Sequence, residues 1–187
     1  KWTEVWTSDY WGNDLVKRAH TGYRPISLLS FKVNYLFGKL DPTSYHLLNI
    51  FFHILASFLL FYLSFLIIFK KNLMIALATS LLFSVHAIHT ENVTSIVGRA
   101  DIIGCLFFLL SFISYNNYLT LDKFKFFLLT VFFAFLALLS KENAVSVLGV
   151  CFFFDLWIKN PHVFKKILRK KINFSNLSSK EKYFLKR

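Results

Sequence analysis

Long apolar runs alternate with short polar segments over most of the chain. The clearest run covers residues 49–69, whose 21 residues include no Asp, Glu, Lys or Arg. A helix rises about 1.5 Å per residue, so this run is long enough for the roughly 30 Å hydrocarbon core of a bilayer. The pattern therefore predicts a transmembrane helix at these residues.

Four more apolar runs follow, each bounded by polar residues: 73–88, 102–115, 126–140 and 144–158. With 14 to 16 residues each, they would extend roughly 21 to 24 Å as helices and fall short of a full crossing by themselves. We expect flanking polar residues to enter the membrane zone there, shielded by protein. The predicted fold class is an all-α, polytopic membrane helix bundle with about five transmembrane helices.

An earlier segment, residues 25–38, places most of its apolar side chains on one face of a helix but also contains Lys32 and Asn34. This pattern is typical of an interfacial amphipathic helix, and a shallow re-entrant helix is the alternative. The chain is therefore predicted to contain a loop with this helix (1–48), a membrane domain (49–158) and a basic segment (159–187).

Composition supports a membrane protein, and charge predicts its orientation. The chain is 56% hydrophobic and includes 24 Phe, more apolar surface than a soluble domain of this size would bury. Its net charge of +12 is spread between apolar runs, which argues against nucleic-acid binding. If the five segments cross in alternation, one side carries +11 and the other +1. The positive-inside rule makes the first side cytoplasmic, with the basic segment near anionic lipid.

The opposite, lumenal side is predicted to collect three polar clusters: 9–12 with 20–25, 86–101, and 141–143. Ionisable groups beside short spans are costly unless they are paired or functional. Asp9 beside Trp11 fits a sugar site and equally an ordinary loop. The clusters together predict a polar cavity that faces the lumen.

Arg99 and Asp101 stand two residues apart before an apolar run. On a helix they diverge by about 200°, so each should find a partner on another segment. For Arg99 that partner is an anionic phosphate, which the guanidinium fork fits, or equally a structural salt bridge to Glu91 or Glu142. Lys141 beside Glu142 leaves the same two interpretations open.

His86 and His89 could share a helical face near Glu91, but the spacing matches no zinc motif and no third ligand is evident. We therefore predict no metal site and interpret the imidazoles as hydrogen-bonding groups. At this point an enzyme that uses a lipid phosphate and an ion- or proton-coupled transporter that uses His86, Glu91, Asp101 and Glu142 both fit. A noncatalytic membrane scaffold is the third class.

Six motifs, in this order, resemble the transmembrane and tetratricopeptide-repeat (TMTC) family: Asp9-Tyr-Trp-Gly, His20-Thr-Gly-Tyr-Arg-Pro, Tyr45-His-Leu-Leu-Asn with His53, His86-Ala-Ile-His-Thr-Glu, Val97-Gly-Arg-Ala-Asp and Lys141-Glu142. Each motif is weak alone, whereas six in sequence are specific. The resemblance runs from about residue 9 to residue 155.

The resemblance implies a multi-pass endoplasmic-reticulum protein O-mannosyltransferase with a GT-C-type fold. Such enzymes transfer mannose from dolichyl-phosphate mannose to Ser or Thr, and the acceptors implied here are cadherin-type domains. The implied mechanism inverts the sugar configuration. No cofactor is expected to be required, and the metal requirement is left open.

The resemblance also implies site roles, residue by residue. Catalytic or orienting carboxylates would be Asp9, Glu91, Asp101 and Glu142. Arg99 is the first candidate for binding the donor phosphate, and Arg24 and Lys141 are the next candidates. His20, His86 and His89 would form hydrogen bonds.

Two departures from the family pattern lead to an expectation about the chain as given. The family's first span and its acidic Asp-Asp motif would precede Lys1, so the principal catalytic acid is expected upstream. The C-terminal repeats are absent, since no 34-residue period is present. We expect this segment to be the middle of a catalytic domain and to be inactive alone.

Overall fold

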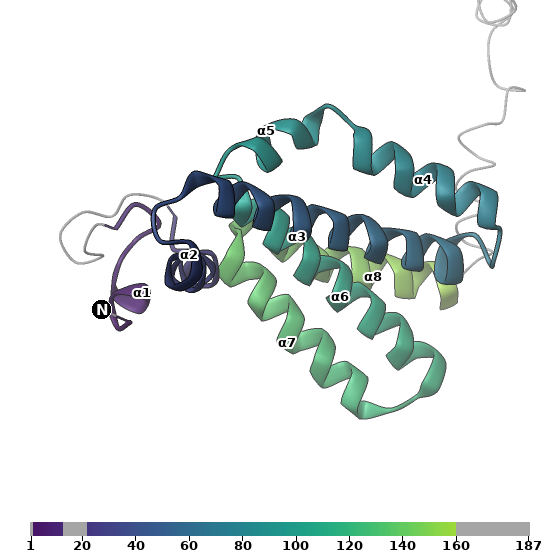
Figure 1. Ribbon diagram of the computed structural model, residues 1–187. Helices are drawn as coiled ribbons and strands as arrows, with labels where there is room; N and C mark the ends of the chain where they lie inside the picture. The colour runs from purple at the N-terminus through teal and green to yellow at the C-terminus, as the bar shows by residue number, and fades with distance from the viewer. Residues whose placement is uncertain (1, 13–21, 160–187) are drawn as a thin grey trace, which may run out of the picture. The chain divides into compact units, whose positions relative to one another are not determined.

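The computed structural model describes residues 2–12 and 22–159, and every regular element there is a helix (Figure 1). The chain divides into two compact units, residues 1–148 and 149–187, which are described separately. The first unit contains α1 (Glu4–Thr7), α2 (Pro25–Gly38), α3 (Pro42–Leu63) with a π-helical continuation (Ser64–Ile68), α4 (Leu73–Val85), α5 (Ile88–Thr94), α6 (Arg99–Leu121), α7 (Phe124–Ser140) and the 3₁₀ turn η2 (Glu142–Val145). Helix α8 (Ser146–Lys159) begins at the end of this unit.

Two helices are long and apolar enough to cross a membrane: residues 42–68 and α6. Helices α4 and α5 would form a third crossing if the pair, bent by 58°, is one broken span. Helix α7 is apolar but shorter. These features confirm the predicted fold class, an all-α membrane helix bundle, whereas alternating passage of five segments stays a prediction.

The third apolar run belongs to a longer helix. Residues 102–115 were expected to cross only with flanking polar residues, and α6 has 23 residues and begins at Arg99. It is longer because polar residues at both ends, including Asp101 and Asn117, continue the helix. The run predicted at 73–88 instead ends as α4 at Val85, and the chain bends before α5.

Helix α6 lies at the centre of the first unit, packed between α3 and α7. Its Ser111 hydroxyl donates to the Thr130 carbonyl of α7 at 3.0 Å, and both side chains are buried. Large apolar side chains on α3, α4 and α7, such as Phe58, Leu82 and Phe135, are exposed. An apolar outer surface is expected for helices surrounded by lipid.

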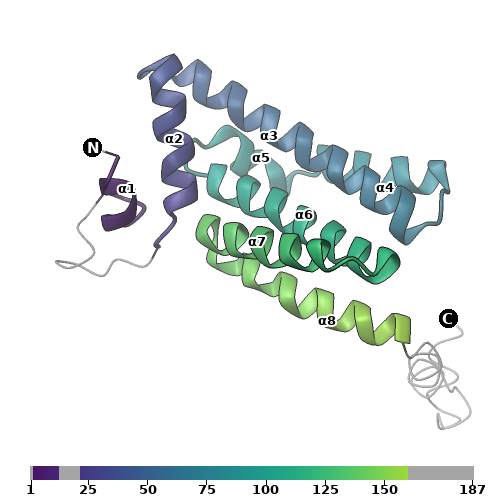
Figure 2. The same ribbon diagram turned by 90° about the horizontal axis from the view of Figure 1, so that it is seen from below.

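Helix α2 runs across one end of the long helices rather than along them, where it packs against α3, α6 and α7 (Figure 2). Pro25 occupies its first turn, where the missing N–H costs nothing. Gly38 is its last residue, and the absence of a side chain there leaves room for the Ser44 side chain of α3, which a Cβ would clash with. Asp41 then caps α3 by accepting from the Thr43 N–H at 3.1 Å. The helix predicted at 25–38 is confirmed, while its interfacial position stays a prediction.

Candidate functional site

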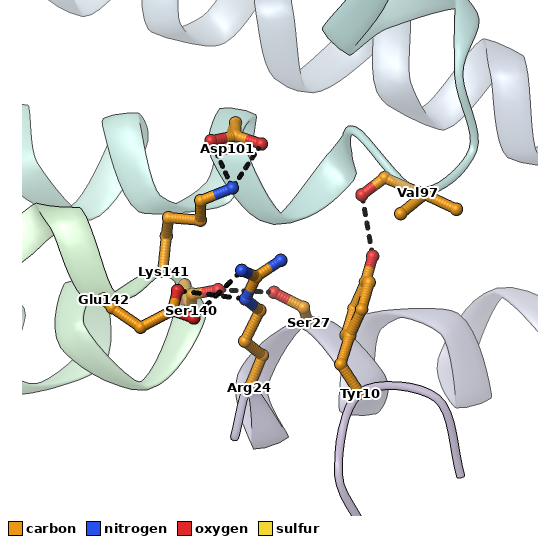
Figure 3. Close-up of polar contacts among 8 residues, drawn as sticks. All are labelled: Tyr10, Arg24, Ser27, Val97, Asp101, Ser140, Lys141 and Glu142. Carbon is orange, nitrogen blue, oxygen red and sulfur yellow. Dashed lines mark hydrogen bonds and ion pairs between the residues drawn. The ribbon is translucent and has the colours of Figure 1, made fainter. Parts of the chain in front are cut away.

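Four charged side chains meet where the start of α2, the start of α6 and the end of α7 come together (Figure 3). We call them the ion-pair cluster: Arg24, Asp101, Lys141 and Glu142. Arg24 directly precedes α2 and forms two hydrogen bonds with Glu142, Nε to Oε2 at 3.1 Å and Nη2 to Oε1 at 3.0 Å. This bidentate geometry is the one that best suits a guanidinium and a carboxylate.

The second pair of the cluster joins Lys141 to Asp101. Lys141 Nζ lies 2.9 and 3.0 Å from the two carboxylate oxygens. Helix α6 permits this approach because Gly104, one turn after Asp101, has no side chain, and a Cβ there would lie 3.0 Å from the Lys141 Cβ. Lys141 and Glu142 are neighbours in sequence, so one short turn after α7 supplies a cation to α6 and an anion to α2.

Tyr10 and Ser27 fix the backbone around the cluster (Figure 3). The Tyr10 hydroxyl donates to the Val97 carbonyl at 2.7 Å, and Arg24 lies 5.1 Å from the centre of the Tyr10 ring. Burial raises the pKa of Tyr10 to about 12, although Arg24 acts in the opposite direction, so the hydroxyl keeps its proton at neutral pH. Ser27 donates to the Ser140 carbonyl at 3.1 Å and joins α2 to α7.

Arg24 also changes the ionisation of its partner. Its hydrogen bonds hold the pKa of the Glu142 carboxyl below the usual value of 4.5, against the opposing effect of partial burial. Glu142 is therefore ionised at neutral pH. A carboxylate in this state accepts a proton poorly while the pair is intact, but it becomes a stronger base if Arg24 moves to another anion.

A pocket of about 300 Å³ adjoins the Lys141–Asp101 pair. Both charged or polar and apolar residues line it. Its lining residues are Asp101, Gly104, Cys105, Phe108, Lys141, Asn143, Ala144 and Ser146. Such a pocket offers a cation and hydrogen-bonding groups beside an apolar helix face, which suits an amphiphilic anion.

Arg99 lies in a different environment, which we call the arginine junction. Its side chain is completely buried, and its guanidinium donates to Asn49 Oδ1 at 2.7 Å, to Asn34 Oδ1 at 2.9 Å and to the Tyr45 carbonyl at 2.9 Å, with a longer contact to the Ser30 carbonyl at 3.5 Å. The alternative prediction, a salt bridge to Glu91 or Glu142, is wrong, because the acceptors are neutral. The phosphate-binding role of Arg99 stays a prediction that would require these contacts to be given up.

The remaining predicted carboxylates lie outside these contacts. Asp9 is fully buried, and its Oδ1 accepts from the Trp11 N–H at 2.9 Å, so it shapes the turn at residues 9–12. Glu91 is exposed on α5, and no hydrogen bond or ion pair among the described residues joins its side chain to the ion-pair cluster. Their catalytic roles stay predictions.

Three of the described histidines, His53, His86 and His89, form a separate group with Phe83. The His89 ring lies 4.2 Å from the Phe83 ring and 5.2 Å from the His53 ring, centre to centre. His86 Nδ1 accepts from the Ile88 N–H at 3.2 Å, at the start of α5. Residues 2–12 and 22–159 hold no group of three His, Cys, Asp or Glu side chains that could bind a metal. His20 lies outside the described residues.

Two functional contributors were missed by sequence reasoning. Asn34 was interpreted as a polar interruption of the helix at 25–38, and Asn49 as the first residue of the span at 49–69, whereas the structure makes both of them acceptors of Arg99. The available signal was position and not charge, since Asn49 stands at the edge of an apolar run and ends the Tyr45-His-Leu-Leu-Asn motif. Conversely, the prediction that Arg99 and Asp101 find partners on other segments is confirmed.

Comparison with known proteins finds similarity to one group of curated sequences. The chain is 41% identical to the human protein O-mannosyl-transferase TMTC1 over 165 residues, which is 82% of this chain and 18% of that protein. It is 40% identical to human TMTC3 over 158 residues and 34% identical to human TMTC4 over 198 residues, with 17% and 27% of those proteins covered. No family model matches the chain. No solved structure matches it either.

Proposed function

Because the chain belongs to the TMTC family of protein O-mannosyl-transferases, we propose that it contributes the lumen-facing part of a site that transfers mannose to Ser or Thr hydroxyls of proteins. The chain spans about a fifth of the length of the curated relatives it matches, so the activity proposed is that of the intact protein. The observation that carries the proposal is the ion-pair cluster, whose residues lie in the motifs that resemble the family and whose Lys141–Asp101 pair lines a pocket.

The proposed reaction uses dolichyl-phosphate mannose as donor. The acceptor hydroxyl attacks C1 of mannose, the new C1–O bond forms, and the bond from C1 to the phosphate oxygen breaks with inversion at C1. The hydroxyl proton passes to a carboxylate, and dolichyl phosphate leaves with the bonding electrons. This reaction needs a base within hydrogen-bond reach and cations that stabilise the charge developing on phosphate.

We assign the phosphate to Lys141 and Arg24. Both are cations paired with carboxylates at partly exposed positions, with side-chain exposures of 22% for Lys141 and 16% for Arg24. A phosphate oxygen can therefore replace a carboxylate oxygen, and each cation remains paired with an anion. The exchange releases Asp101 or Glu142, which then becomes able to orient the sugar or accept a proton.

The rest of the proposal follows the family. It comprises a GT-C-type membrane domain, a multi-pass position in the endoplasmic-reticulum membrane, and cadherin-type domains as acceptors. The apolar outer surface of α3, α4 and α7 supports contact with the bilayer. The apolar face of the pocket, which includes Phe108 of the candidate span α6, suits the lipid part of the donor.

The test measures mannose transfer in microsomes that contain the intact protein. With labelled dolichyl-phosphate mannose and a cadherin-type acceptor domain, wild type should transfer mannose, and Lys141→Gln should raise the donor KM by about tenfold or more, because one charge-assisted contact is worth roughly 1.5–3 kcal/mol.

Lys123→Gln is the matched control, since Lys123 and Lys141 flank opposite ends of α7. The control should behave as wild type. Absence of transfer by the wild type at normal expression would overturn the proposed function. Solute movement across liposomes without the lipid-linked donor would favour a transporter instead.

A further inference from the structure

Arg99 is a buried cation that contacts no carboxylate within the part of the chain that the structure describes. All four oxygens around its guanidinium belong to side-chain amides or backbone carbonyls. Two aromatic rings cover it as well, with ring centres 4.6 Å from the guanidinium carbon for Phe31 and 5.4 Å for Tyr45. A buried charge is tolerated only where hydrogen bonds replace its water, and here oxygens from α2 and α3 and two ring faces do so.

The contacts of Arg99 join three helices through one group. Asn34 and the Ser30 carbonyl belong to α2, Asn49 and the Tyr45 carbonyl belong to α3, and Arg99 itself begins α6. A guanidinium carries several N–H donors in a planar fork, so it can bind several acceptors at once. The ammonium group of a lysine side chain cannot reproduce this geometry.

The two asparagines extend the junction. Asn34 Nδ2 donates to Ser44 Oγ at 3.0 Å, beside the turn between α2 and α3. Asn49 Nδ2 donates to the Ser95 carbonyl at 3.0 Å and lies 3.4 Å from the Val93 carbonyl, just before α6. Each amide therefore accepts a hydrogen bond from Arg99 through its oxygen and donates one to a neighbouring segment through its nitrogen.

The same helix α2 that Arg99 holds is directly preceded by Arg24, one of the four residues of the ion-pair cluster. Ser27 joins α2 to the end of α7, and Arg24, one turn earlier, reaches Glu142. On α6, Asp101 follows Arg99 by two residues and binds Lys141. Arg99 thus connects both pairs of the cluster, through α2 to Arg24 and through α6 to Asp101.

We propose that Arg99 is a positioning residue: its guanidinium fork clamps α2 onto α3 and α6, so that Arg24 and Lys141 present their charges together to the donor phosphate. It acts through these two cations and does not touch the phosphate. The contacts of Arg99 hold the three helices together whatever the protein binds, whereas the effect of Arg99 on donor binding rests on the proposed function.

The first test measures amide hydrogen exchange of residues 25–38 in the purified intact protein without donor. Arg99→Gln and Arg99→Lys should both speed exchange in α2 by about tenfold, because neither side chain holds α2 and α3 together. Asn34→Leu, which removes one acceptor and keeps the arginine, should have a smaller effect in the same direction.

Lys141→Gln is the control for this exchange experiment, since Lys141 contacts α6 and not α2, and α2 should exchange in it as in wild type. Unchanged exchange of α2 in both Arg99 variants would overturn the clamp. This readout needs no enzymatic activity, so it stands or fails independently of the proposed function.

The second test separates positioning from general stability and from direct phosphate binding. Arg99→Lys should raise the donor KM by about fivefold, and its effect in an Arg24→Gln background should be smaller than in wild type, because part of it acts through the contact of Arg24 with phosphate. A lower maximal rate at unchanged KM would reduce Arg99 to a folding role, and fully additive effects on KM would make it an independent phosphate ligand. Either result overturns the proposal.

Discussion

Two arginines that contact or flank α2 occupy opposite kinds of environment: Arg24, which directly precedes α2, and Arg99 of α6, which binds Asn34 of α2. Arg24 pairs with a carboxylate whose side chain is 49% exposed, whereas Arg99 is completely buried among neutral oxygens. An exposed pair can exchange its carboxylate for another anion at small cost. A buried cation held by several fixed acceptors cannot move without leaving those groups unsatisfied. The comparison favours the ion-pair cluster as the group that binds an anion and the arginine junction as the group that holds α2 against α3 and α6.

The largest effect on stability should come from breaking the arginine junction. Asn49→Leu removes the 2.7 Å acceptor of Arg99 and the donor to the Ser95 carbonyl. We expect a loss of about 2–3 kcal/mol, because a hydrogen bond to a charged group is lost and a buried charge is left less satisfied. Thermal unfolding of the intact protein in detergent measures it.

Asn143→Leu is the matched change at an exposed asparagine, and it should stay within about 0.5 kcal/mol of wild type. Equal destabilisation by the two leucines would show that the junction is no more important to the fold than a surface residue, and the contrast between the two arginines would lose its basis.

A second prediction concerns the close approach of Lys141 to α6. Gly104→Ala places a Cβ 3.0 Å from the Lys141 Cβ, so we expect about 1–2 kcal/mol of destabilisation from overpacking together with a higher donor KM. Gly149→Ala is the control, because nothing lies within 4 Å of a Cβ there. It should stabilise its helix by about 0.5–1 kcal/mol. A Gly104→Ala protein with normal stability and KM would contradict the role given to this contact.

The exposed pair should have a small effect on stability. Glu142→Gln removes the charge that Arg24 binds, but this carboxylate is half exposed, and exposed pairs contribute about 0–1 kcal/mol. The unfolding midpoint of the intact protein should therefore shift much less than in Asn49→Leu. A destabilisation of Glu142→Gln as large as that of Asn49→Leu would contradict the distinction between an ion pair that binds an anion and a junction that stabilises the fold.

The smallest effect is a dependence on pH. The pKa of Glu142 is lowered in the folded protein from 4.5, so the pair stabilises the fold above pH 4.5 and this contribution is lost as pH falls through the lowered pKa. The difference in unfolding midpoint between wild type and Glu142→Gln should be constant from pH 8 to about 6 and should shrink in acid. A difference that grows below pH 4.5 would contradict the direction of the shift.

The sequence was sufficient for the helices, since a long uncharged run such as 49–69 leaves a membrane helix as the simplest structure. It also predicted that Arg99 and Asp101 would find partners on different segments, because helical geometry separates positions two apart. It did not predict which partners, since hydrogen bonds between α2, α3 and α6 depend on how helices cross. Asn34 and Asn49 carry no charge, so nothing in their identity marked them as the acceptors of an arginine.

Charge-conserving substitutions at the two sites test the central distinction most directly. Donor KM would be measured for Lys141→Arg and Arg99→Lys in microsomes with matched amounts of the intact protein. We expect Lys141→Arg to remain near wild type, because the ion-pair cluster needs a cation, and Arg99→Lys to be strongly impaired, because the junction needs the guanidinium fork. Wild-type KM in Arg99→Lys together with an impaired Lys141→Arg would contradict the account.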